Sequence, residues 1–142
     1  MNFKKIILYK EPAISEINTK LLTEFLEEKF PIKVEIKNNV FKEFSLEYIK
    51  KLSNIRITDI KNPFSEHKSS DDEIEFEKKL CEDSSVMNST TKVENAQEIS
   101  EVFMYDGFEL QKILRYLNKD NEVLHIILTN RLTCTFDEND KR

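Results

Sequence analysis

Glycine is almost absent from this chain, since Gly107 is the only one in 142 residues. Phosphate-binding loops of the P-loop and dinucleotide-binding types need several glycines, because the backbone must approach the phosphate closely. The common nucleotide-binding motifs are therefore excluded. Histidine and cysteine are also scarce, with only His67, His125, Cys81 and Cys134. Because the two cysteines are single and far apart, we expect reduced thiols and no structural disulfide.

The chain also lacks an excess of positive charge and any long apolar run. It has 22 Lys and Arg against 27 Asp and Glu, a net charge of -5, whereas nucleic-acid binding needs a basic surface. No run approaches the roughly 20 apolar residues of a membrane-spanning helix. The apolar run Ile6 to Tyr9 is too short for a signal peptide. We therefore predict a cytoplasmic protein that binds neither nucleic acid nor membrane.

The first part of the chain has the pattern of a strand, a helix and a second strand. Residues 5–9 form an apolar run that ends at Glu11-Pro12, and residues 32–36 alternate between apolar and polar side chains. Between them, apolar residues recur at three- and four-residue steps from Ile14 to Phe30. A helical connection of this length predicts that the two strands are parallel.

The remainder alternates between predicted helices, a polar segment and one more strand. Ser45 and Asp106 are N-cap residues that begin two further predicted helices. Residues 62–98 are polar, and we expect a mobile insertion there that contains one short helix. Residues 123–128 form the most hydrophobic strand, which we place in the middle of the sheet. The pattern predicts a single α/β domain over residues 1–142, with a small mixed sheet of three to four strands and packed helices.

Four candidate substrate-binding residues lie in or just after the strand at residues 123–128. Asn130, Arg131 and Thr133 follow its carboxyl end, where open α/β sheets tend to bind ligands. Arg131 suits a carboxylate, although pairing with a surface acid such as Asp137 is the alternative. His125 lies inside the strand, where a histidine is either a ligand-binding group or a hydrogen-bonded core residue.

The other reactive side chains indicate no catalytic or metal site. Glu66, His67, Asp71, Asp72 and Glu73 supply metal-ligand types, but their spacing fits no known ligand pattern, so we predict a solvated acidic loop. Cys134 lacks an obvious base, and we expect a buried, unreactive thiol. We therefore predict no catalytic residue and no bound metal.

Four blocks of the sequence together resemble an archaeal family regarded as zinc metallopeptidases, which is distantly similar to the archaemetzincins. The likeness spans most of the chain outside residues 62–98, in the blocks KKIILYKEP, FPIKVEIKNNVFKEF, YDGFELQKILRYL and HIILTNRLTCTFDENDKR. It implies the N-terminal half of a zincin-like fold. In such folds a helix with the motif H-E-x-x-H follows and holds zinc.

This chain departs from that family pattern, because it contains no H-E-x-x-H. Zinc would be a cofactor only if a longer form carried the ligands. The resemblance therefore implies a metallopeptidase-like domain that is inactive as this chain and binds a peptide or protein, with the segment after Thr129 as a pairing edge. On this hypothesis Arg131→Ala leaves the fold intact and weakens peptide binding. The alternative is a small cytosolic protein-interaction module without a catalytic role, whose residues 62–96 face the partner.

Overall fold

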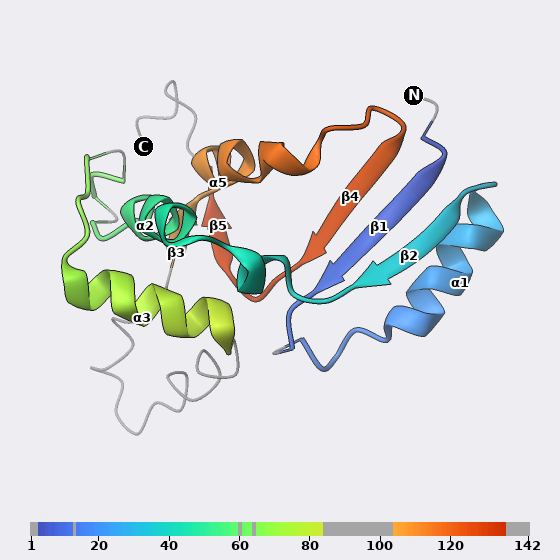
Figure 1. Cartoon of the computed structure of the whole chain (residues 1–142), viewed down its shortest axis with the longest axis horizontal. Helices are drawn as coiled ribbons and strands as arrows, with labels where there is room; N and C mark the ends of the chain where they lie inside the picture. Colours follow the sequence, from blue (N-terminus) through green and yellow to red (C-terminus); the bar gives the residue numbers. More distant parts are fainter. Residues whose placement is uncertain (1–2, 13, 60, 64, 84–103, 136–142) are drawn as a thin grey trace.

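Parallel strands form the main sheet of the computed structural model (Figure 1). The structure describes residues 3–12, 14–59, 61–63, 65–83 and 104–135. Three strands pair side by side in the order β2 (Lys33–Lys37), β1 (Lys5–Lys10) and β4 (Val123–Leu128). The predicted α/β class is confirmed, and so is the parallel pairing of the first two strands, in which Ile6 lies opposite Val34.

Two details of the predicted sheet are wrong. The described strands of the main sheet are all parallel, so this sheet is not mixed. The hydrophobic strand β4 lies at one edge, and β1 occupies the middle. Four consecutive residues of β1, Ile6 to Tyr9, are buried, whereas all six residues of β4 are only partly buried. A continuous apolar run indicates that both faces of a strand are covered. It does not indicate whether the strand has one neighbouring strand or two.

Helix α1 (Thr19–Lys29) covers one face of the main sheet at its β2 side (Figure 1). The side chain of Asn18 caps its first turn, accepting from the backbone N–H groups of Lys20 and Leu21. Leu22 and Leu26 pack against the buried side chains of that face, which are Ile6, Leu8 and Val34. No residue of α1 is fully buried, so this helix is held by a thin apolar contact.

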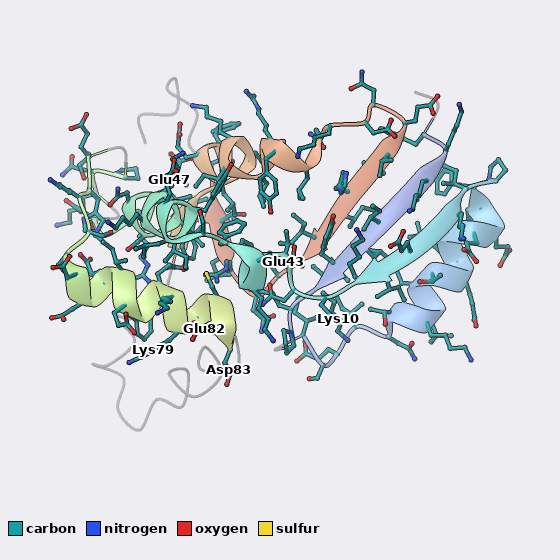
Figure 2. The ribbon with its side chains drawn as sticks, viewed as in Figure 1. Lys10, Glu43, Glu47, Lys79, Glu82 and Asp83 are labelled. Atoms are coloured by element: carbon teal, nitrogen blue, oxygen red, sulfur yellow. The ribbon has the colours of Figure 1, made fainter. Side chains whose placement is uncertain are left out.

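The other part of the molecule combines short helices with a second, two-stranded parallel sheet. In chain order its elements are η1 (Val40–Glu43), α2 (Leu46–Asn54), α3 (Asp71–Glu82), β3 (Met104–Asp106), α5 (Gly107–Leu114), η3 (Arg115–Leu117) and β5 (Leu132–Cys134). Ser45 and Asp106 cap α2 and α5 as predicted. Glu43 lies on η1, between the main sheet and these helices (Figure 2). Among the described helices, none is both long and apolar enough to cross a membrane.

The larger core joins the second part of the molecule to the other face of the main sheet. It contains the buried side chains of Ile7, Tyr9, Val40, Phe41, Phe44, Ile49, Leu52, Cys81, Tyr105 and Leu110. Residues from β1, η1, α2, α3, β3 and α5 thus share one cluster. The two sheets therefore belong to one packed unit, and their junction lies where the carboxyl end of β1 meets this core (Figure 1).

Helix α3 confirms the short helix expected within the polar segment 62–98. Ser70 and Glu73 form a capping box at its start. Glu77, Leu80 and Cys81 are buried on its inner face, while Lys79 and Glu82 point outward (Figure 2). Part of this segment is thus packed into the fold. Residues 84–98, on which much of the predicted mobility and of the alternative partner-facing role depended, lie outside the described residues.

The single glycine stands where α5 and β5 approach each other closely. Gly107 is the first residue of α5, and a Cβ atom there would lie 3.0 Å from the Cγ2 atom of Thr135. That distance is shorter than an ordinary van der Waals contact between carbon atoms. An alanine at this position would therefore require the side chain of Thr135 to give way by a few tenths of an ångström.

Candidate functional site

Glu11 fixes the turn that follows β4. It comes directly after β1, its side chain is only 1% exposed, and its backbone N–H donates to the carbonyl of Leu128 over 3.1 Å. Its Oε2 atom accepts from the hydroxyl of Thr129 at 2.6 Å and from the backbone N–H of Asn130 at 3.0 Å. The carboxyl ends of β1 and β4 are thereby joined by one buried carboxylate.

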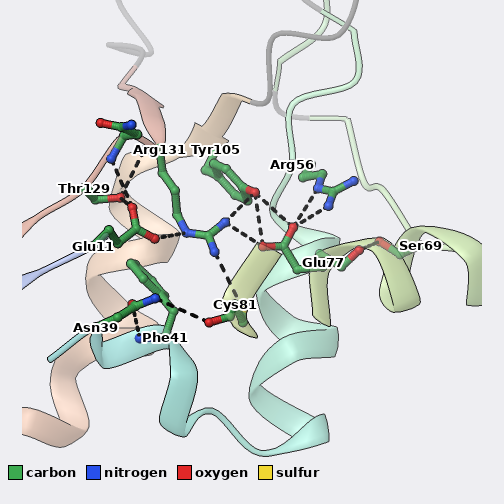
Figure 3. Close-up of polar contacts among 12 residues, drawn as sticks. Glu11, Asn39, Phe41, Arg56, Ser69, Glu77, Cys81, Tyr105, Thr129 and Arg131 are labelled. Atoms are coloured by element: carbon green, nitrogen blue, oxygen red, sulfur yellow. Dashed lines mark hydrogen bonds and ion pairs between the residues drawn. The ribbon is translucent and has the colours of Figure 1, made fainter. Parts of the chain in front are cut away.

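Arg131 lies between this carboxylate and a second one on α3 (Figure 3). Its side chain is fully buried. The Nη1 atom donates to Glu77 Oε1 over 2.7 Å, and Nε lies 3.4 Å from Glu11 Oε1, an ion-pair distance. The guanidinium also lies over the ring of Phe41, 4.4 Å from its centroid, which adds a cation–π contact.

Glu77 on α3 accepts hydrogen bonds from three other buried side chains. Its carboxylate accepts from Arg131, from the hydroxyl of Tyr105 at 2.9 Å, and from Arg56, whose Nη2 and Nε atoms lie at 2.5 and 2.9 Å. We call Glu11, Arg56, Glu77, Tyr105 and Arg131 the junction network. It holds two carboxylates and two guanidinium groups, so its formal charges cancel inside the protein, as buried charges require.

Burial and neighbouring charges set the ionisation of this region. Burial raises the pKa of Cys81 to about 12, so its thiol is neutral near pH 7 and is a poor nucleophile. Burial also raises the pKa of Tyr105 above its ordinary value. Although burial by itself lowers the pKa of Arg131, nearby Tyr105 and Glu77 raise it overall. The Cys81 thiol and the Tyr105 hydroxyl are thus neutral near pH 7, and Arg131 keeps its positive charge.

The four predicted binding residues occupy different environments. Asn130 and Thr133 are exposed, and Arg131 is only 4% exposed. The ion pairs of Arg131 go to Glu77 and Glu11, which fixes its side chain within the fold. The expectation that Arg131→Ala leaves the fold intact therefore has no support from these contacts. Whether these residues bind a peptide stays a prediction.

His125 is partly buried on the face of β4 that belongs to the larger core. Its Nδ1 atom lies 3.1 Å from the hydroxyl of Tyr9, and the two rings stack with centroids 5.8 Å apart. Burial and then the charge of Lys37 lower the pKa of His125. The hydrogen-bonded core histidine, one of the two alternatives that the sequence left open, is therefore what the geometry supports.

Sequence reasoning missed Glu11, Glu77, Tyr105 and Arg56. One signal for Glu77 was present, because it falls between Ile74 and Leu80 on the apolar side of α3 at three-residue spacing. A carboxylate in such a row is buried only if a partner compensates its charge. Nothing in the local sequence distinguished the other three residues from surface residues.

The described residues offer no set of ligands that fits zinc. Across the described ranges, no group of three or more His, Cys, Asp or Glu side chains is close enough to hold a metal ion. The imidazole of His67 instead lies 3.0 Å from Glu73 of the α3 capping box, and Asp71 and Asp72 belong to the first turn of that helix. A structural or catalytic zinc site needs three or four such ligands, so no step of a reaction is assigned to a metal here.

A groove of about 660 Å³ lies between the end of α2 and the start of α5. Its lining combines charged side chains of both signs, among them Arg56, Lys68, Asp106 and Glu109, with the imidazole of His67. A second groove shares Asn54, Ile55 and Glu109 with it and continues to Tyr48 and Tyr116. Asn130, Thr133 and His125 line neither groove, so the predicted binding residues and these hollows are separate features.

Strand β4 has mostly apolar side chains, and in the described part of the chain no strand pairs with its outer edge. The carbonyl groups of Glu122 and Leu128 both point to β1, where they accept from Lys5 and Glu11. Since backbone groups of alternate residues point to opposite sides of a strand, those of His125 and Ile127 face away from β1. The opposite sheet edge differs, because Glu27 accepts from the backbone N–H of Val34 there at 3.0 Å.

A comparison with known families gives one match. The model of a family described as "Probable metallopeptidase family (DUF6775)" matches residues 2–142. No curated protein and no solved structure matches the chain.

Proposed function

The chain belongs to this probable metallopeptidase family, and from that premise we propose that it is a peptide-binding domain without catalytic activity of its own. An extended peptide pairs with the outer edge of β4. The observation that carries the proposal is the apolar strand β4, in which the outward backbone groups of His125 and Ile127 have no strand partner among the described residues. An exposed hydrophobic edge strand favours pairing with another extended chain, because its N–H and C=O groups are left without partners.

The difference between the two sheet edges supports β4 as the binding edge. At β2, the carboxylate of Glu27 occupies an outward N–H group, and Lys33, Glu35 and Lys37 place charge along the strand. Charged side chains are a common protection of edge strands. β4 has five aliphatic residues and one histidine over six positions. Of the two edges, β4 therefore offers the more favourable apolar surface to a peptide.

The set of reactive side chains supports the absence of catalysis in this chain. There is no H-E-x-x-H, and only two histidines are present in all. His125 is paired with Tyr9 and His67 with Glu73. A peptidase of this kind needs at least three metal ligands and a general base at the metal-bound water. The proposal has two further parts. The first is a distant relationship to the archaemetzincins, and the second is that a zinc ion would need ligands from a longer form of the protein.

The junction network positions the peptide-binding segment in this proposal. Glu11 accepts from the backbone N–H of Asn130, and the next residue, Arg131, donates to Glu77 of α3. The turn between β4 and β5 is thus fixed from within, while Asn130 and Thr133 remain exposed. Rigid presentation of an edge lowers the entropy that a binding protein loses. We therefore assign Arg131 a positioning role.

The test compares two substitutions at one position of the β4 edge. His125→Pro removes the outward N–H group and places a ring at the edge, whereas His125→Ala removes only the imidazole. Peptide affinity is measured by fluorescence anisotropy with a labelled library of extended peptides. We expect the proline variant to lose at least about tenfold in affinity, because one or more backbone hydrogen bonds are lost. The alanine variant is expected to bind within about threefold of wild type.

Circular dichroism and thermal melting show whether both variants fold, since an edge proline leaves the β1 pairing intact. If no peptide of the library binds the wild-type chain, or if both variants bind like wild type, the β4 edge is not a peptide site. Zinc content and proteolysis of the same peptides are measured in parallel. Stoichiometric zinc with peptide cleavage would contradict the proposed lack of catalysis.

A further inference from the structure

His125 has a neighbouring strand on one side only in the described part of the chain. It lies opposite Ile7 of β1 in the parallel register, and no described strand pairs with the outer side of β4. The imidazole is partly buried. Its Nδ1 atom lies 3.1 Å from the hydroxyl of Tyr9, and the two rings stack. The flank of the imidazole toward β1 is thus closed, and the other flank lies where a further strand would be added.

An extended peptide on the outer edge of β4 would enclose this imidazole. Residues that lie directly opposite each other in neighbouring strands share one face of the sheet, with Cβ atoms roughly 5 Å apart. The peptide residue opposite His125 would therefore cover the second flank of the ring. Removal of water from an ionisable group disfavours its charged form. A bound peptide without an acidic side chain at that position thus favours the neutral imidazole over the imidazolium.

Titratable and charged side chains from several elements share the face of the sheet on which His125 lies. They are Lys5 and Tyr9 on β1, Lys33, Glu35 and Lys37 on β2, Glu43 on η1 and Tyr116 on η3. Glu35 pairs with Lys5, whereas the polar contact of His125 goes to Tyr9. Burial and then the charge of Lys37 lower the pKa of His125. The imidazole is therefore neutral near pH 7, and no described carboxylate forms an ion pair that would retain a proton on it.

We propose that His125 makes peptide binding at the β4 edge sensitive to pH, so that the chain holds a peptide near neutral pH and releases it in mildly acidic solution. This inference rests on the proposed function, because it assigns a regulatory role to a residue of the same edge. Peptide binding and protonation of the imidazole each disfavour the other, as two linked equilibria must. The affinity is therefore complete above the pKa of His125 and decreases as the pH falls through it, since the free chain takes up a proton that the bound chain excludes.

Fluorescence anisotropy of the full chain at pH 7 and pH 5 tests this inference, with an extended peptide that has blocked ends and no Asp, Glu or His. We expect the dissociation constant of wild type to rise about three- to tenfold at the lower pH, since one pH unit between the free and bound pKa of His125 is worth about tenfold in affinity. His125→Gln should remove this rise. The other histidine of the chain, His67, pairs with Glu73 on α3, and His67→Gln is the matched control that should keep it. Circular dichroism at both pH values shows whether each variant is folded.

Nuclear magnetic resonance of the imidazole groups tests the linkage in the wild-type chain itself. The titration midpoint of His125 should fall when the peptide saturates the chain, and that of His67 should stay unchanged. Equal peptide affinity at the two pH values, an equal decline in His125→Gln, or an unmoved midpoint of His125 overturns the inference and leaves the peptide site intact. Absence of peptide binding at every pH refutes the peptide site and the inference together.

Discussion

The main sheet is held by different kinds of contact at the carboxyl end of β1 and on its β2 side. At the carboxyl end of β1, the junction network joins β1, β3, α3 and the turn after β4 through paired charges that are almost completely buried (Figure 3). On the β2 side, α1 is held by the half-buried side chains Leu22 and Leu26 and by one hydrogen bond, in which Glu27 accepts from the backbone N–H of Val34. Directional contacts thus define the part of the sheet where the predicted binding segment lies, and mainly non-directional apolar contacts attach α1.

This difference matters because the two kinds of contact fail in different ways. Truncation of one member of a buried ion network leaves an uncompensated charge, which costs far more than the lost contact. Truncation of a half-buried leucine loses only a part of its apolar burial. The junction should therefore be sensitive to single substitutions, whereas the α1 side should tolerate them.

The largest effect is expected from Arg131→Ala. Removal of the guanidinium leaves Glu11 without its cation and deprives Glu77 of one of two cations. We expect the free energy of unfolding to fall by about 3–5 kcal/mol, measured by urea denaturation. The exposed Arg115 of η3 provides the matched control: Arg115→Ala should change stability by less than about 0.5 kcal/mol. Equal stability of the two variants would show that the junction network does not hold the fold.

Much of the fold could be predicted, because local signals determine it. The spacing of apolar residues located α1, the side chains of Ser45 and Asp106 located the starts of α2 and α5, and a helical connection gave the parallel pair β1–β2. The order of the strands could not be predicted in the same way. The position of a strand in a sheet depends on contacts between residues more than 100 positions apart, such as Ile6 and Leu124. The sequence of β4 by itself does not show that this strand has only one neighbour in the described sheet.

The candidate site was predicted only in part, since a residue type does not reveal its burial. Arg131 was identified as important from its place after β4, but its partners Glu11 and Glu77 resemble surface acids in a chain with 27 acidic residues. A cation that follows an apolar strand is equally consistent with a ligand-binding group and with a buried ion pair. The fold decides between them by bringing α3 against the end of β1.

A pair of leucine truncations should give a smaller effect and sharpen the comparison. Leu80 on α3 is completely buried beside the junction network, whereas Leu26 on α1 is half-buried. Leu80→Ala should cost about 2–5 kcal/mol, because it leaves a cavity, and Leu26→Ala only about 1–2 kcal/mol, because less area is lost. Urea denaturation measures both. If the two variants lose equal amounts of unfolding free energy, α1 is packed as tightly as the junction, and the contrast between the junction and the α1 side is wrong.

The smallest effect is a dependence of stability on pH that comes from His125. Its pKa is lowered in the folded protein, first by burial and then by Lys37. The unfolded chain therefore binds a proton more readily near the ordinary histidine pKa of about 6.5. It follows that the contribution of this group to stability is complete above that pH and decreases as the pH falls through the window below it. In melting curves from pH 7 to 5, His125→Gln should remove part of the decline that wild type shows. His67→Gln serves as the control for loss of a histidine away from Tyr9, and an identical decline in wild type and His125→Gln would exclude His125 as its source.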